Sequence, residues 1–184
     1  MALTLAVALS LLLNGCSADY DRIINESTEE IQKHPRDSEA YRIRGRAREE
    51  KGDYDLAIAD YTKTIEIAPG AARPYYLRCN LYSKKGDYDQ AMVDCDKAIE
   101  LDPGDAYAYY LRARTWEEKG ELHKAMKDCT EAIEKSQMIW LDVELYSARA
   151  QLWLQLGEFD RYEEDLSRAK ELSDFIPGSQ KPLD

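Results

Sequence analysis

A five-residue turn sequence recurs along this chain at intervals of 34 residues. Lys51-Gly52-Asp53-Tyr54-Asp55 returns at 85–89 and, in a degraded form, at 119–123, and a fourth copy at 156–160 lies 37 residues further on. Prolines at 35, 69 and 103 follow the same 34-residue interval. A period of this length is typical of repeat architectures, in which each unit buries its apolar face only by stacking on its neighbours.

Between the turns, apolar residues fall at helical spacing, as in Leu56, Ile58, Tyr61 and Ile65. Each unit is therefore predicted to contain two helices. The first ends at the glycine turn, where glycine permits a positive φ, and the second ends at the proline, which cannot continue a helix. This pattern predicts an all-α chain of stacked helix pairs.

This pattern resembles the tetratricopeptide repeat, because residues of the same kind recur at four positions of the unit. They are the aromatics Tyr41, Tyr75, Tyr109 and Tyr146, the small residues Gly45, Cys79, Ala113 and Ala150, the alanines Ala57, Ala91 and Ala125, and the set Thr64, Ala98, Ala132 and Ala169. The resemblance implies an α-solenoid of antiparallel helix pairs that forms a right-handed superhelix. In that family the inner, concave surface binds peptides.

The first fifteen residues carry no charged side chain and differ from the rest of the chain. Met1 to Leu13 is too short an apolar stretch to span a bilayer, but it fits the apolar core of a secretory signal. Leu13-Asn14-Gly15-Cys16 resembles a bacterial lipobox, which implies cleavage before Cys16 and lipidation of that cysteine. The alternatives are a secretory signal cut after Ala18, which would leave a free, secreted soluble protein, and a buried N-terminal helix.

Ser17 follows the lipobox cysteine, and by the same resemblance this implies the outer membrane, facing the periplasm, as the destination. Residues 20–35 match a second helix alone, which predicts an N-terminal half-repeat. The predicted boundaries are 1–15 for the signal peptide, 16–37 for the lipidated cysteine, tether and half-repeat, 38–71, 72–105 and 106–139 for three full repeats, 140–172 for a divergent fourth repeat after an insertion around 136–140, and 173–184 for a C-terminal tail.

An arginine and an aspartate recur in all four units at positions where the family consensus does not require them. The expected structural ion pairs are Arg44 with Asp60, Arg78 with Asp94, Arg112 with Asp128, and Arg149 with Asp165. Buried charges persist only when they are paired, so we interpret this row as a structural ladder within or between repeats. The functional alternative is a row of arginines that reads acidic groups on a ligand.

The first helices carry arginine and tyrosine at the positions that line the concave groove in this family. These residues are Arg42, Arg46, Arg73, Tyr76, Asn80, Tyr107, Tyr110 and Arg114. Arginine and tyrosine dominate the binding energy of protein interfaces, and so this strip is the predicted partner-binding surface. An ordinary solvated face is the alternative. Glu49, Glu50, Glu117 and Glu118 lie nearer the glycine turns on the same face, which predicts a groove that is basic at one end and acidic at the other.

Cysteine chemistry gives two alternatives for Cys79 and Cys95, which are expected to face each other across one helix pair. An oxidising periplasm could join them, or both could be small buried hydrophobic residues. The second interpretation is favoured because disulfide geometry is demanding. The chain has no C-x-x-C motif, and therefore neither a redox centre nor a zinc site is predicted.

The net charge and the motif content of the sequence argue against several classes of function. A formal net charge of −11, from 36 acidic and 25 basic residues, argues against nucleic-acid binding, which needs clustered lysine and arginine. We find no catalytic motif, so neither an enzyme, nor a cofactor, nor a small-molecule substrate is predicted. The sequence predicts a lipid-anchored envelope scaffold that binds a peptide or partner protein; the alternative is a structural subunit of an envelope assembly such as secretion, pilus or outer-membrane machinery.

Overall fold

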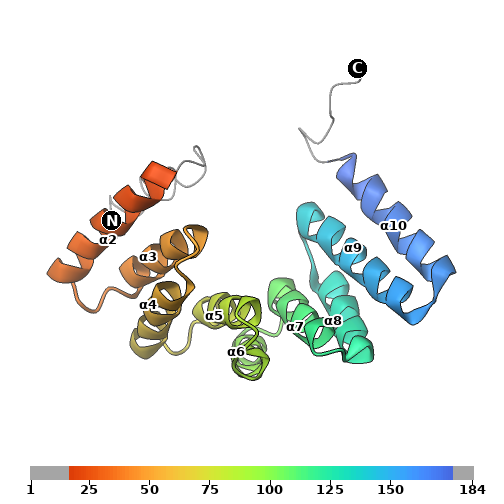
Figure 1. Ribbon diagram of the computed structural model, residues 1–184, viewed down its shortest axis with the longest axis horizontal. Helices are drawn as coiled ribbons and strands as arrows, with labels where there is room; N and C mark the ends of the chain where they lie inside the picture. The colour runs from red at the N-terminus through yellow and green to blue at the C-terminus, as the bar shows by residue number, and fades with distance from the viewer. Residues whose placement is uncertain (1–16, 176–184) are drawn as a thin grey trace, which may run out of the picture. The chain divides into compact units, whose positions relative to one another are not determined.

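The computed structural model describes residues 17–175, and within this range it is helical with short connections (Figure 1). This confirms the all-α fold class predicted from the 34-residue period. The helices are α2 (Ser17–Lys33), α3 (Ser38–Glu50), α4 (Tyr54–Ile67), α5 (Ala72–Lys84), α6 (Tyr88–Leu101), α7 (Ala106–Glu118), α8 (Leu122–Lys135), α9 (Ile139–Leu156) and α10 (Phe159–Ser173).

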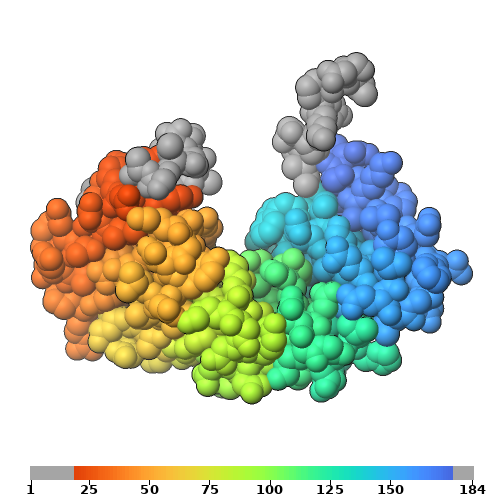
Figure 2. Space-filling model, in the orientation of Figure 1, coloured from red at the N-terminus to blue at the C-terminus, as the bar shows by residue number. Residues whose placement is uncertain are grey.

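The helices form two compact units, and the boundary between them falls after Leu81, inside α5. In the first unit α3 packs on α2 and α4, and α4 packs on α5 through Tyr61 and Leu77. In the second unit α7 packs on α6 and α8, α8 packs on α9, and α9 packs on α10. Figure 2 shows the surface of each unit, with α9 and α10 in blue.

Local sequence determines where the helices begin and end. The four turn glycines, at positions 52, 86, 120 and 157, all have φ between 76° and 83°, a conformation that residues with a Cβ rarely adopt. At helix starts, Asp37 accepts a hydrogen bond from the Glu39 N–H at 2.9 Å, and Asp105 accepts one from the Tyr107 N–H at 2.9 Å. These caps satisfy N–H groups that have no partner inside the helix.

The divergent fourth repeat differs from the others in the length of its first helix. α9 has 18 residues, whereas α3, α5 and α7 have 13 each, so residues of the insertion extend this helix at its start. Met138, Ile139 and Trp140 there are about half exposed. α10 ends at Ser173, the first residue of the predicted tail. The predicted signal peptide and Cys16 lie outside the described residues.

The tightest packing in the first unit is between Gly45 of α3 and Tyr61 of α4. A Cβ placed on Gly45 would lie 2.8 Å from Cε1 of Tyr61 and 3.1 Å from Cβ of Asp60. Tyr61 is fully buried, and its ring therefore requires a residue without a side chain on the facing helix. In the third repeat the equivalent residues are Ala113 and Cys129, a larger residue facing a smaller one.

The three described cysteines differ in state. Cys79 and Cys95 are disulfide-bonded, and Cys129 is a buried free thiol. The favoured interpretation of Cys79 and Cys95 as free, buried hydrophobic residues is therefore wrong, because neither cysteine is free. The sequence spacing alone could not distinguish the two, because a disulfide depends on the distance and direction of both Cβ atoms.

Burial of Cys129 raises the pKa of its thiol to about 12, because a thiolate is poorly solvated there. The thiolate is the nucleophile, so iodoacetamide at about pH 8 should leave Cys129 unmodified in the native protein and modify it in urea. Peptide mass mapping measures both. In the unfolded chain a cysteine thiol ionises at about pH 8.5. Deprotonation therefore favours the unfolded state as the pH rises from about 8.5 towards 12, and the free energy of unfolding should fall over this range. Native labelling as fast as labelling in urea would show that Cys129 is accessible.

Candidate functional site

The structure brings three of the four predicted arginine–aspartate pairs together. Arg112 donates from Nε to Oδ2 of Asp128 at 2.7 Å and from Nη2 to Oδ1 at 2.8 Å. Arg149 and Asp165 have the same geometry, at 2.7 and 2.8 Å. Such two-point contacts are strong because both groups are charged and planar. Arg78 and Asp94 belong to different units, and their pairing stays a prediction.

Arg44 and Asp60 form the pair in the first repeat. The Arg44 Nη2 group lies 2.7 Å from Oδ1 of Asp60, and Arg48 adds a second cation 2.7 Å from Oδ2 of the same carboxylate. In the fourth repeat, Trp153 Nε1 donates to Asp165 at 3.1 Å in an equivalent way. Each of these buried carboxylates therefore has its oxygens occupied by donors from the neighbouring first helix.

Each arginine of the ladder also reaches back to the second helix of the preceding repeat, which the sequence reasoning missed. Arg78 donates from Nη1 to Thr62 Oγ1 at 2.8 Å, and Arg112 donates from Nη1 to Asp96 Oδ1 at 2.7 Å. The four acceptors recur every 34 residues, and this spacing could have revealed them: Thr28, Thr62, Asp96 and Thr130. The ladder thus joins consecutive repeats as well as the two helices of one repeat.

The recurring tyrosines of the first helices pack against the same arginines. The Arg44 guanidinium lies 5.5 Å from the centre of the Tyr41 ring, and the corresponding distance from Arg112 to Tyr109 is 5.6 Å. The hydrogen bond to Asp128 raises the pKa of Arg112 further above its usual value. The donors of Arg112 and Arg149 are thus used inside the protein, which favours the interpretation of these pairs as a structural ladder.

In the first unit, two of the predicted groove residues are occupied by internal contacts. Arg42 donates from Nε to Glu39 at 2.7 Å. Asn80 donates from Nδ2 to Glu49 at 3.1 Å, and the other oxygen of Glu49 accepts a hydrogen bond from the Tyr61 hydroxyl at 2.9 Å. Glu49 was expected to form part of an acidic end of the groove, but the structure uses it to join three helices.

The remaining predicted residues of the first unit have a different character. Arg73 is exposed, and Arg46 is half-buried; within residues 17–175 neither forms an ion pair. Tyr76 is half-buried and packs on the cluster that contains Leu77 and Leu81. The first helices of this unit therefore carry two unpaired cations, within residues 17–175, and a partly buried aromatic ring.

In the second unit, Tyr107, Tyr110 and Arg114 of α7 lie together. The two rings are 5.9 Å apart and inclined at 43°, and the Arg114 guanidinium lies 5.9 Å from the centre of the Tyr110 ring. Burial raises the pKa of Tyr110 above its usual value. Arg114 is exposed and forms no ion pair in the described part of the chain. We call these three residues the α7 cluster.

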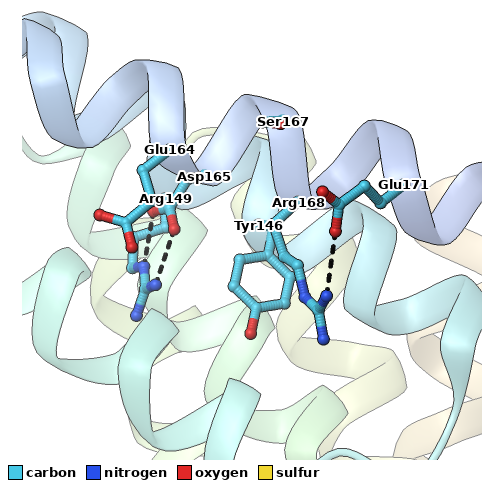
Figure 3. A pocket seen from close by; sticks show the side chains of 7 residues that line it. All are labelled: Tyr146, Arg149, Glu164, Asp165, Ser167, Arg168 and Glu171. Carbon is cyan, nitrogen blue, oxygen red and sulfur yellow. Dashed lines mark hydrogen bonds and ion pairs between the residues drawn. The ribbon is translucent and has the colours of Figure 1, made fainter.

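A polar cavity of about 430 Å³ lies between α9 and α10 in the second unit. Its lining is mainly charged: Tyr146, Arg149, Glu164, Asp165, Ser167, Arg168 and Glu171 (Figure 3). Both arginines are paired, Arg149 with Asp165 and Arg168 with Glu171 at 3.0 Å. Part of the cavity lining, Arg149 with Asp165, therefore belongs to the ion-pair ladder.

No group of three or more histidine, cysteine, aspartate or glutamate side chains is placed to hold a metal ion in residues 17–175. In the same part of the chain, every helix is too short or too polar to cross a membrane.

Comparison with family models identifies the class of protein. Three models, each described as tetratricopeptide repeat, match residues 28–72, 72–105 and 95–127. Together these matches cover residues 28–127, more than half of the chain. The chain belongs to the tetratricopeptide repeat family. A comparison with curated protein sequences finds no significant match.

Solved structures with the same fold include two bacterial proteins. A thermophilic tetratricopeptide repeat protein of Thermus thermophilus, TTC0263, is 21% identical, with a TM-score of 0.76 over 96% of this chain and 92% of that one. MamA of Desulfovibrio magneticus RS-1 is 17% identical, with a TM-score of 0.75 over 87% of this chain and 89% of that one. As many as 258 solved chains match, so these likenesses identify the fold and no particular partner.

Proposed function

We propose that this protein is a non-enzymatic scaffold that binds a peptide segment or a partner protein on the surface of its first helices. The observation that carries the proposal is the α7 cluster, in which Tyr107 packs against Tyr110 and the exposed Arg114 lies over the Tyr110 ring without forming an ion pair in residues 17–175. Proteins of this family are generally interaction scaffolds, and the family groove lies on the side of the first helices.

The α7 cluster suits a protein partner for physical reasons. Tyr107 and Tyr110 are already held by packing on α9, through Leu141 and Leu145, so their rings lose little conformational entropy on binding. Arg114 can donate several hydrogen bonds in one plane, which matches a carboxylate or a row of backbone carbonyls. A partner segment with acidic and apolar residues fits this composition.

Substituting Tyr76, Tyr110 and Arg114 together by alanine tests the proposal. Loss of two aromatic anchors and one arginine should weaken partner binding by at least about 100-fold, because each such hot spot contributes about 2 kcal/mol or more. Pull-down from cells followed by quantitative mass spectrometry measures the retained partners. Arg168→Ala, which removes an exposed arginine of α10, is the matched control. If every partner of the wild-type protein remains bound to the triple variant, the first-helix surface is not the binding site.

We propose further that the mature protein is lipid-anchored at the bacterial cell envelope through Cys16, on the periplasmic side of the outer membrane. The lipobox resemblance of 13–16 supports this anchor. Cells grown with an alkyne analogue of palmitate should label the wild-type protein and leave Cys16→Ala unlabelled, as measured by in-gel fluorescence. Equal labelling of both, or labelling of neither, would exclude lipidation at Cys16.

A second candidate is a permanent structural subunit of an envelope assembly. It is favoured by Met138, Ile139 and Trp140, three consecutive large apolar residues with 49–53% of their surface exposed, since permanent interfaces are more apolar than transient ones. Purification in mild detergent discriminates the candidates. A scaffold should elute as a monomer after a salt wash, whereas a permanent subunit should keep a fixed stoichiometry with its neighbours.

A further inference from the structure

The fourth repeat has an exposed face whose counterparts in the inner repeats are covered by the first helix of the following repeat. We define the end surface as Leu154 of α9 and Phe159, Leu166 and Ser167 of α10. Leu154, Phe159 and Leu166 are 46%, 63% and 45% exposed. Figure 2 shows α10, in blue, at the edge of its unit. In the first three repeats, which we call the inner repeats, a helix covers this face, and so a helix is the element expected to cover the end surface.

Leu166 shows the difference most clearly. Its counterparts on the earlier second helices are Tyr61, Cys95 and Cys129, and all three are at most 1% exposed. Tyr61, for example, is covered by Leu77 and Leu81 of the next first helix. The position of Leu166 is therefore buried in every repeat whose second helix is covered by the first helix of the next repeat.

Leu154 occupies a position at which the inner repeats contact the next first helix through hydrogen bonds. Glu49 accepts from Asn80 at 3.1 Å, and Glu117 accepts from Gln155 at 2.7 Å. Ser83 and Thr115 are 3.4 Å apart at the equivalent position of the second repeat. In the fourth repeat the polar acceptor is replaced by leucine, so this part of the end surface is suited to an apolar contact.

Ser167 continues the series of acceptors that bind the arginine of a following first helix. Thr62, Asp96 and Thr130 each accept from such an arginine, at 2.8, 2.7 and 3.4 Å. Ser167 stands in register with them and forms no side-chain hydrogen bond in the described part of the chain. Its hydroxyl is exposed beside Leu166, and both are positioned to contact one additional helix.

We infer that the end surface binds a helix of a partner protein that presents a leucine followed directly by an arginine. Leu77-Arg78 and Leu111-Arg112 have this sequence on the inner first helices. Both leucines are buried, Leu77 packs against Tyr61 of the preceding second helix, and both arginines reach their acceptors there. Glu163 and Lys170 replace Met126 and Ile133 of the third repeat. The bound helix therefore meets polar groups on both sides of Leu166 and is not a regular further repeat.

A second copy of this chain does not supply that helix readily. Arg44, Arg78, Arg112 and Arg149, the arginines of its own first helices, already contact the preceding second helix within each chain. To dock one of them, the second copy would have to break an internal contact. A separate protein remains the occupant that the chemistry favours, independently of the first-helix surface proposed above.

A synthetic peptide of residues 105–118, which contains Leu111-Arg112 and its own N-cap, is the probe for this site. Fluorescence anisotropy with the purified full chain should show saturable binding with a Kd below about 1 mM. Leu166→Asp should weaken binding by at least about tenfold, because it removes an apolar contact. Ser167→Ala in the protein, or Arg112→Gln in the peptide, should each weaken it by about tenfold, the value of one charged hydrogen bond.

Val93→Asp is the matched control, because Val93 is also an exposed aliphatic residue of a second helix but does not lie on the end surface. It should leave the Kd unchanged, as should Arg114→Glu on the first-helix surface. Circular dichroism of each variant verifies that it is folded. Absence of binding to the wild-type protein below about 1 mM, or equal binding to the wild-type, Leu166→Asp and Ser167→Ala proteins, would overturn the inference.

Discussion

Replacing Arg112 by alanine should lower the free energy of unfolding by about 3–5 kcal/mol, the effect of leaving a buried charge without its partner. Arg112 contacts Asp128 through two hydrogen bonds and Asp96 of the preceding second helix through a third. Asp128 is buried, so the truncation leaves its carboxylate in the interior with no cation. Urea unfolding followed by circular dichroism measures the loss.

Arg168→Ala is the control for this prediction, because Arg168 also pairs with a carboxylate but both side chains are more than half exposed. Exposed pairs contribute at most about 1 kcal/mol, and the control should unfold at nearly the wild-type urea concentration. At a temperature where both variants are folded, Arg112→Ala should retain partner binding. Equal stability of the two variants, or a loss of binding without a loss of stability, would instead support a ligand-reading role for the arginines.

Replacing Tyr61 by alanine should lower the free energy of unfolding by about 3–5 kcal/mol, as for other large aromatic residues removed from a core. The ring is fully buried between Gly45, Leu77 and Leu81. Its hydroxyl also holds Glu49, which in turn accepts a hydrogen bond from Asn80. Tyr61→Phe keeps the ring and removes only the hydroxyl, and so it should lose about 1–3 kcal/mol. Differential scanning calorimetry can compare both with the wild-type protein.

Gly45→Ala provides a complementary test of the same contact. The added methyl group would lie within 3.0 Å of the Tyr61 ring, and overpacking of this kind costs about 1–3 kcal/mol. In the background of Tyr61→Cys, which reproduces the alanine–cysteine combination of the third repeat, the same substitution should cost less than about 0.5 kcal/mol. If Gly45→Ala costs the same in both backgrounds, the close contact with Tyr61 is not the reason for the glycine.

The helices and their register were predictable because each depends on residues close together in sequence. The turn glycines and the cap at Asp105 act within a few residues, and the 34-residue period places the arginines and aspartates on facing helices. The second contact of each ladder arginine could also have been predicted from the sequence, because its acceptors recur with the same period: Thr28, Thr62, Asp96 and Thr130. It was missed because the acceptors differ in residue type.

Other features depend on three-dimensional packing that the pattern does not contain. Glu49 looked like a free acidic residue of the groove, but a tyrosine and an asparagine from two other helices use both of its oxygens. The disulfide state of Cys79 and Cys95 depends on backbone geometry. The end surface could not be recognised from the sequence, because leucine is common at core positions. Nothing in the pattern shows that Leu166 is exposed whereas Cys129, its counterpart in the third repeat, is buried.

The central claim is that partners bind the first-helix surface at the α7 cluster, and a photo-cross-linking amino acid at Tyr110 in living cells tests it most directly. Lys127, an exposed residue of the second helix α8, is the matched control position. We expect a discrete cross-linked product from position 110, identified by mass spectrometry, which disappears when Arg114→Glu is added, and none from position 127. No product from position 110, or the same products from both positions, would contradict the claim.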